Sequence, residues 1–345
     1  MPGVVSVRAM KTPALFALLA WFTSVTHAPA CLAIAPGKGA VVNADQSVIM
    51  IWDAARQEQH FIRQANFKTD AADVGFIVPS PSRPTLSSAG KAAFPRLEEI
   101  TAPAFKPGGG FGFGCSTTSM SLGSFSSVRV IEEKRVAGYD ATVLTAESGA
   151  DLMAWLRDHG YSYSPEVAAW AQPYLGGGWH FTALKVAKDG GAEEIQAAAL
   201  RITFRTERPL FPYREPASAA AAQRLGVKDR LLRIYFISEA RYRAEVAGGN
   251  WSGKVVWSGD ITPHRSALLA DLKMPAATLP GNWWLTEFED HWPYEQAAGD
   301  VYFSRDSSQK TKTRPDVTAQ VRHDGALVAF VAVAALRPLR RRRRG

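Results

Sequence analysis

The alternation of apolar and polar side chains predicts a chain rich in β-strands. Short apolar runs with many β-branched and aromatic residues predict strands over residues 48–52, 60–68, 75–78 and 231–237. Between residues 200 and 205, apolar side chains alternate with polar ones, which is typical of a strand with one buried face. The spacing of the first three runs resembles that of hairpins, so we expect mainly antiparallel pairing.

Helical signals interrupt the strands at two places. Residues 91–100 predict a short helix. Ser148 is a suitable N-cap for a helix over residues 150–159, and Gly160 follows its end. Pro165 stands at the first position of a second helix, where proline is favoured. The pattern therefore predicts an α+β fold of mainly antiparallel strands with an inserted helix pair.

The N-terminal residues 1–30 have the pattern of a secretory signal peptide. Two basic residues precede an apolar stretch over residues 13–25, and small residues then lead to a cleavage point after Ala30. Cleavage there makes Cys31 the first mature residue. Lipidation of Cys31 is one alternative, although the preceding residues match a lipobox poorly. We expect the body of the chain to fold outside the cytoplasm.

The C-terminal residues 325–339 predict a hydrophobic anchor, and the basic tail 340–345 follows it. Twelve mostly apolar residues span about 18 Å as a helix, and arginine stems extend that reach by snorkelling. A block of arginines after an apolar run is a stop-transfer signal that stays in the cytoplasm. We expect the protein to be anchored to the cytoplasmic membrane, with its domain on the extracytoplasmic side. The alternatives are a buried C-terminal helix and a sorting tag that is later cleaved.

The body of the chain divides into three parts. Residues 31–106 form an N-terminal strand-rich part, 107–127 a Gly/Ser-rich loop or linker, and 128–320 an α+β part. The net charge of +8 does not belong to this body. The two ends hold eight basic residues and no acidic ones, so the 40 basic residues fall to 32, equal to the number of acidic ones. A neutral body argues against a nucleic-acid partner.

Cys115 is the first residue considered for catalysis, because it lies in the Gly/Ser-rich loop. A nucleophilic cysteine needs a base. The possible partners are His60, His159, His180, His264 and His291, and the sequence selects none of them. The two cysteines of an exported chain more often form a disulfide, here between Cys31 and Cys115. The glycines at 108–114 fit neither a P-loop nor a dinucleotide-binding pattern.

Acidic pairs and tryptophans are the remaining candidates. The pair Glu132-Glu133 and the run 287–290 could support acid–base chemistry on a glycan, but a solvent-exposed face is the favoured interpretation. Trp251, Trp257, Trp283, Trp284 and Trp292 could stack on sugars, although we expect most tryptophans in the core. The histidines lack metal-ligand spacing. The sequence assigns no catalytic, cofactor-binding or metal-binding residue, and we expect no cofactor.

Several segments, in collinear order, resemble the bacterial family called domain of unknown function 2330. They are VIMIWD (48–53), HFIRQANF (60–67), VGFIVPSPSRP (74–84) and the stretches 139–161, 178–186, 200–214 and 285–305. The resemblance implies a signal peptide and often a C-terminal membrane segment, in agreement with the two ends. It implies no activity, substrate or catalytic residue. The mature N-terminus departs from the expected pattern, because it holds only Cys31.

Three functional hypotheses follow. The first is a membrane-tethered extracytoplasmic domain that acts by binding or scaffolding in the cell envelope, with an envelope protein or a glycan as partner. The alternative is an exported hydrolase that uses Cys115 or a carboxylate pair. The third is a purely structural envelope component. A deep pocket with convergent polar groups would favour the enzyme.

Overall fold

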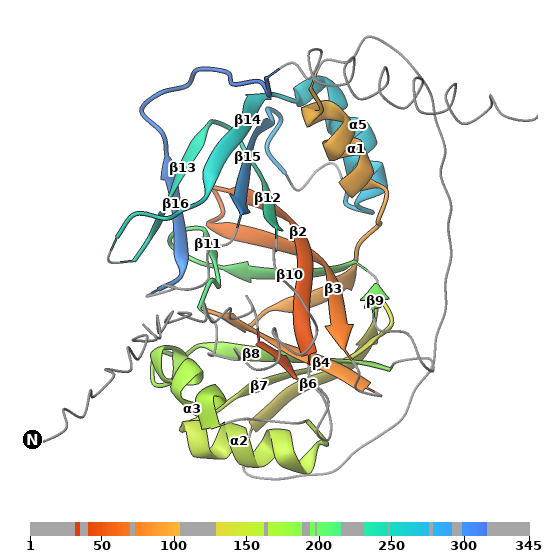
Figure 1. The fold of residues 1–345 in the computed structure, drawn as a ribbon, viewed down its shortest axis with the longest axis vertical. Helices are drawn as coiled ribbons and strands as arrows, with labels where there is room; N and C mark the ends of the chain where they lie inside the picture. The colour runs from red at the N-terminus through yellow and green to blue at the C-terminus, as the bar shows by residue number, and fades with distance from the viewer. Residues whose placement is uncertain are drawn as a thin grey trace, which may run out of the picture.

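The computed structural model describes eleven stretches of the chain (Figure 1). They are residues 32–34, 41–69, 73–103, 129–161, 165–187, 194–196, 199–214, 231–247, 249–275, 279–291 and 299–315. The predicted signal peptide, both cysteines, the Gly/Ser-rich segment 107–127 and the predicted C-terminal anchor lie outside them. Among the residues that are described, none of the helices has the length and apolar character needed to cross a bilayer.

The largest sheet has eight strands and is called here the large sheet. Its order is β14 (Lys254–Asp260), β15 (Trp284–His291), β12 (Leu231–Ser238), β2 (Val41–Asp53), β3 (Glu58–Thr69), β10 (Leu200–Arg205) and β5 (Thr85–Ser88), and β9 (Glu194–Gln196) pairs with β3. The pairing of β12 with β2 is parallel, and the other described pairings are antiparallel.

Two smaller antiparallel sheets complete the β structure. The five-stranded sheet has the order β1 (Leu32–Ile34), β4 (Asp73–Ser80), β8 (His180–Ala187), β7 (Tyr139–Thr145) and β6 (Arg129–Val136). The three-stranded sheet has the order β11 (Leu210–Phe211), β16 (Val301–Arg305) and β13 (Tyr242–Val246). Strands from both sides of the segment 107–127 contribute to both larger sheets, so their cores are built jointly.

The central core contains side chains from all three sheets. Strand β2 contributes to this core with one face and to a second core with the other. Val48 and Met50 face this central core, whereas Ile49 and Ile51 face a second core on the other side of the large sheet. A strand that is covered on both faces needs apolar residues at consecutive positions. The unbroken run at 48–52 therefore reflects burial on two sides.

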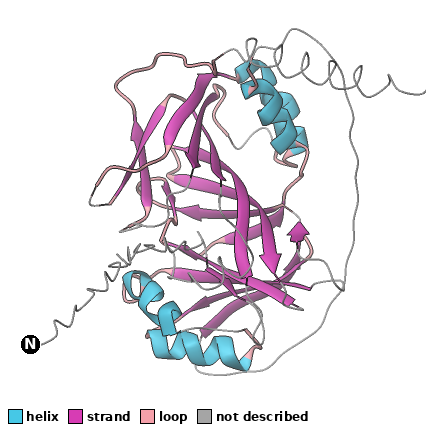
Figure 2. Ribbon diagram, viewed as in Figure 1, coloured by secondary structure: helices cyan, strands magenta, loops and turns pink. Residues whose placement is uncertain are grey.

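Helices cover the outer faces of the two larger sheets (Figure 2). They are α1 (Ala93–Thr101), η2 (Thr262–His264) and α5 (Arg265–Asp271) on the large sheet, and α2 (Gly149–Asp158), α3 (Pro165–Ala171) and η1 (Gln172–Tyr174) on the five-stranded sheet. The pair α1 and α5 thus lies at one end of the molecule and the pair α2 and α3 at the opposite end.

Helix α2 begins and ends within one residue of its predicted bounds, and α3 begins at Pro165 as predicted. The Ser148 hydroxyl accepts a hydrogen bond from the Asp151 backbone N–H at 3.1 Å and caps α2. Gly160 follows the helix with a φ of +73°, and the Tyr161 N–H reaches back to the Leu156 carbonyl at 2.8 Å. This backbone path favours glycine. The α+β class with mainly antiparallel strands is confirmed.

Candidate functional site

Strand β15 carries two carboxylates into the protein interior. Its alternation sends Phe288 into the central core and Leu285 into the core beneath α1 and α5. Glu287 and Glu289 share the face of Leu285, and they are 0% and 6% exposed. Isolated carboxylates are very costly to bury, so each of them requires a cationic partner.

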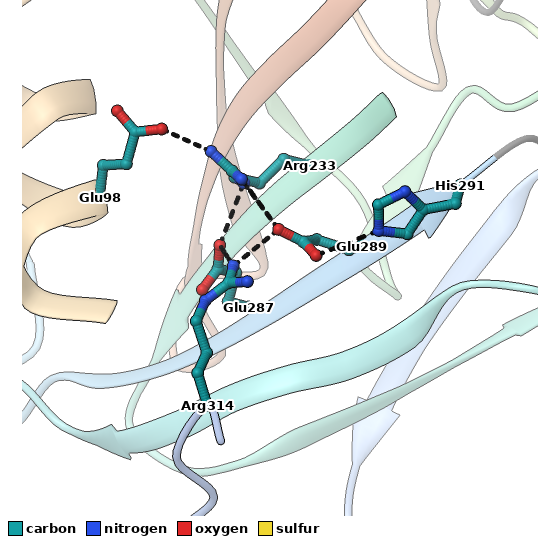
Figure 3. A network of polar contacts seen from close by, with 6 residues as sticks. All are labelled: Glu98, Arg233, Glu287, Glu289, His291 and Arg314. Atoms are coloured by element: carbon teal, nitrogen blue, oxygen red, sulfur yellow. Dashed lines mark hydrogen bonds and ion pairs between the residues drawn. The ribbon is translucent and has the colours of Figure 1, made fainter. Parts of the chain in front are cut away.

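Two arginines that are distant in sequence supply those partners (Figure 3). Arg233 of β12 lies 3.2 Å from Glu287 and 2.9 Å from Glu289, and it also binds Glu98 of α1 at 2.7 Å. Arg314 donates from one nitrogen to both buried carboxylates, at 2.7 Å to Glu287 and 2.6 Å to Glu289. The result is a charge network that joins β12, β15, α1 and the C-terminal residues.

The network affects its two carboxylates differently. Burial raises the pKa of Glu287, and this effect outweighs the opposing attraction of Arg314 and Arg233. Burial acts in the same direction at Glu289, but hydrogen bonds from Arg314 and Arg233 hold the pKa of that carboxyl below its usual range. Glu289 is therefore the firmly ionised member, and Glu287 depends more strongly on its arginines.

The structure corrects the interpretation of residues 287–290 as a solvent-exposed face. Glu287, Glu289 and Asp290 are all buried. Local sequence gives no sign of this, because the neutralising arginines lie 54 residues before Glu287 and 27 residues after it. The other acidic pair agrees with its prediction, since Glu132 is half-buried and Glu133 is exposed on the strand β6.

Two further buried carboxylates accept hydrogen bonds from neutral groups. Asp290 accepts from the Tyr213 hydroxyl at 2.8 Å and from the Ser252 hydroxyl at 3.1 Å. Asp300 accepts from the Tyr174 hydroxyl at 2.8 Å and from the Tyr213 backbone N–H at 3.0 Å. Burial raises the pKa of both carboxyls. The Asp300 contacts join η1 to the residue before β16, and the Asp290 contacts join β15 to Tyr213 and Ser252.

Residues 306–315, called here the C-terminal strap, hold Arg314 in place. The strap begins at an ion pair of 3.1 Å between Asp306 and Arg241. Lys312 then exchanges two backbone hydrogen bonds of 2.8 Å with Ser258, at the outer edge of β14. The strap thereby covers the edge of the large sheet and delivers Arg314 to the face beneath α1. In Figure 1 it runs from the end of β16 past β13 to the top of β14.

A shallow hollow of about 390 Å³ lies on the outer side of the three-stranded sheet. Arg208, Glu245 and Tyr302 line it, together with the turn that follows β13. The Arg208 guanidinium lies 5.2 Å from the centre of the Tyr302 ring and pairs with Glu245 at 2.5 Å. Two charged groups that line the hollow, Arg208 and Glu245, are therefore bound to each other.

The histidines considered as bases lie on separate elements. His60 is buried on β3 between the Thr203 hydroxyl, at 2.9 Å, and Glu58, at 3.6 Å. Burial, with the charge of Arg201 in support, lowers the pKa of His60 to about 4. The remaining candidates are His159 after α2, His180 in β8, His264 in η2 and His291 in β15. No described group of three or more His, Cys, Asp or Glu residues has the arrangement of a metal site.

The tryptophans divide between core and surface. Trp283 is 1% exposed, as predicted for a core residue. Trp251, Trp257 and Trp284 are half-buried, and the Trp284 indole donates to the Ser258 hydroxyl at 2.8 Å. Trp292, like the proposed disulfide between Cys31 and Cys115, falls outside the described residues, and both interpretations stay predictions.

The sheets and the buried charge network define an α+β protein whose C-terminal strap is part of its fold. The family model described as "Uncharacterized protein conserved in bacteria (DUF2330)" matches residues 25–304. The chain therefore belongs to this family, as its sequence segments predict. The match ends before the strap and Arg314. No curated protein matches the sequence.

Among solved structures, the crystal structure of baculovirus P35 is similar at 8% sequence identity. The alignment covers 80% of this chain and 97% of that one, with a TM-score of 0.32. A score this low is below that of a shared fold.

Proposed function

We propose that the protein is an exported domain, tethered to the cytoplasmic membrane by residues 325–339, that acts by binding or scaffolding in the cell envelope. The observation that carries this proposal is the C-terminal strap. The described part of the chain ends in this segment, which is held by ion pairs and backbone hydrogen bonds up to Arg314. A predicted membrane anchor begins eleven residues later, at Gly325.

A C-terminal segment that is bound to the domain is consistent with a tether that begins farther along the chain. Any force on the anchor is transmitted first to the strap, where Arg314 binds two buried carboxylates. The signal peptide predicted at residues 1–30 and the arginines at 340–344 are consistent with the same topology. The domain then lies outside the membrane and the basic tail inside.

The charge network argues against Glu287 and Glu289 as the carboxylate pair of the hydrolase alternative. A carboxylate pair that performs acid–base chemistry must reach its substrate. Glu287 and Glu289 are buried, and both are bound by Arg233 and Arg314. Their geometry supports a role in joining structural elements. The other version of the hydrolase, which uses Cys115, is tested by alkylating the cysteines before and after reduction.

Cell fractionation tests the tether. The full chain and a variant that lacks residues 325–345 are expressed in bacteria, and membranes are washed at alkaline pH, which removes peripheral proteins. We expect the full chain to stay in the membrane pellet and the truncated variant to appear in the periplasmic fraction. Release of the full chain by the alkaline wash would refute the tether. Retention of the truncated variant in the membrane pellet would mean that another part of the chain anchors the protein, and acylated Cys31 would be the first candidate.

A further inference from the structure

We propose that the outer edge of β14, together with Glu287 and Glu289, forms a docking site for an extended, arginine-bearing segment of another protein. The C-terminal strap occupies this site until such a segment displaces it. The inference rests on the binding part of the proposed function, for which it names a site and the chemistry of a partner, and it does not depend on the membrane tether. Its evidence is how the strap is held, which charge it neutralises and how its backbone presents Arg314.

The strap is held by polar contacts. All ten of its residues are described, none of them is buried, and none belongs to a hydrophobic core. Its attachments are ion pairs and hydrogen bonds, such as those of Arg241 with Asp306 and with the Lys310 carbonyl. Contacts of this kind exchange with water at a small net gain, and displacement of the strap exposes little apolar surface. The strap can therefore leave the domain while the cores stay packed.

Removal of Arg314 leaves the site short of positive charge. Glu287 and Glu289 then share the guanidinium of Arg233 with Glu98, so three carboxylates compete for one arginine. Buried carboxylates require compensation, so the vacated site attracts a cation. Figure 3 shows the Arg314 guanidinium against both buried carboxylates, at 2.7 and 2.6 Å from a single nitrogen. Arginine suits such a site better than lysine, because it is always charged and carries several donors in one plane.

The backbone of the strap adds a specific register. Lys312 exchanges two backbone hydrogen bonds of 2.8 Å with Ser258 on the outer edge of β14, and its ammonium group donates to the Val255 carbonyl. Arg314 follows two residues later, and alternate side chains of an extended chain point to the same side. Addition of a strand to a sheet edge is a recurrent mode of peptide recognition. We therefore expect the partner segment to be extended, with a basic residue two positions before its arginine.

The tethered strap competes with any segment that arrives from solution. Its covalent connection holds it near the site at an effective concentration of roughly millimolar order. A segment from solution binds only the molecules in which the strap is open, so its apparent Kd rises in inverse proportion to that open fraction. A substitution that loosens the strap without changing the site should therefore tighten the binding of the segment. A permanent structural contact would not have this property.

A peptide titration tests this expectation. The probe is a fluorescent peptide with the sequence of residues 306–315, and its anisotropy is followed as the full chain is added in detergent. In the chain, Lys312→Pro removes the exposed N–H that donates to the Ser258 carbonyl, and Arg314→Gln removes the guanidinium. We expect each folded variant to bind the probe at least about tenfold more tightly than the wild type does. The control Arg305→Gln, at an exposed ion pair of 3.7 Å, should bind the probe as the wild type does.

Two matched changes test whether the site recognises the arginine itself. A probe in which glutamine replaces Arg314 should bind the Lys312→Pro chain at least about tenfold more weakly than the unaltered probe does. Glu289→Gln, added to the Lys312→Pro chain, should weaken the binding of the unaltered probe to a similar extent, because it removes the firmly ionised carboxylate. Equal binding of the two probes would overturn the assignment of arginine.

Two further outcomes decide the proposal as a whole. If the folded Lys312→Pro and Arg314→Gln chains bind the probe no more tightly than the wild type, the site accepts no second segment and the inference is wrong. If light scattering shows wild-type dimers that Arg314→Gln abolishes, the occupant is the strap of a second copy, and the assignment to another protein is overturned. The titration needs no membrane, so its failure leaves the tether to be decided separately by cell fractionation.

Discussion

Replacing Arg314 by glutamine should destabilise the domain although this residue lies at its edge. The Arg314 side chain is only 20% exposed. In the variant, Arg233 is the one arginine of the network that still binds Glu287 and Glu289. Loss of one partner from a buried ion pair costs about 3–5 kcal/mol. Because Arg233 remains bound to both carboxylates, we expect less than this range, about 2–3 kcal/mol, and a fall in Tm of roughly 5–10 °C.

The same loss should depend on pH in a defined direction. Burial already raises the pKa of Glu287 in the folded protein, and removal of Arg314 raises it further. A folded state with a raised carboxyl pKa takes up a proton more readily than the unfolded chain, so its stability rises as the pH falls toward that pKa. The defect of Arg314→Gln should therefore be smaller at pH 5 than at pH 7.

Thermal and urea unfolding of the full chain in detergent, at both pH values, measure these effects. Arg305→Gln is the matched control, because Arg305 is 62% exposed and should change stability by less than about 0.5 kcal/mol. The double variant Glu287→Gln/Arg314→Gln should lose less than the sum of its single variants, since it removes the orphaned charge. If Arg314→Gln matched Arg305→Gln at pH 7, the strap would be an incidental contact and the reasoning would fail.

Three further substitutions test other parts of the fold. Because burial lowers the pKa of His60, this residue's contribution to the free energy of unfolding is fully present above pH 6.5 and falls by about 3 kcal/mol toward pH 4. Urea titrations should show that His60→Gln removes this decline and that the exposed control His264→Gln keeps it. Ser148→Ala should cost about 1 kcal/mol in urea unfolding through loss of the α2 cap, whereas Ser148→Thr, which keeps a hydroxyl for both contacts with Asp151, should cost much less. Gly75→Ala places a methyl group 2.4 Å from the Tyr161 ring and should lower Tm by several degrees in calorimetry, with no change indicating that the ring can move away.

Much of the fold follows from local sequence patterns. The runs at 48–52 and 231–237 lie in β2 and β12, because apolar residues at consecutive positions suit strands that are covered on both faces, and residues 60–68 lie in β3 as predicted. Ser148 and Gly160 mark the ends of α2 because their caps depend only on neighbouring backbone groups. Signals of this kind need no knowledge of distant partners.

The charge network could not be predicted in the same way. A strand that contains Glu287, Glu289 and Asp290 resembles an exposed edge until its partners are known. Those partners, Arg233 and Arg314, come from a neighbouring strand and from the C-terminal strap. Burial of charge depends on contacts between residues far apart in sequence, which no local pattern encodes.

Protease accessibility in spheroplasts tests the central claim most directly. The full chain carries one epitope tag in the exposed turn at Gly176–Gly178 and another after Gly345. Added protease should remove the first tag and spare the second until the membrane is permeabilised. Protection of both tags in intact spheroplasts would place the domain in the cytoplasm and contradict the account.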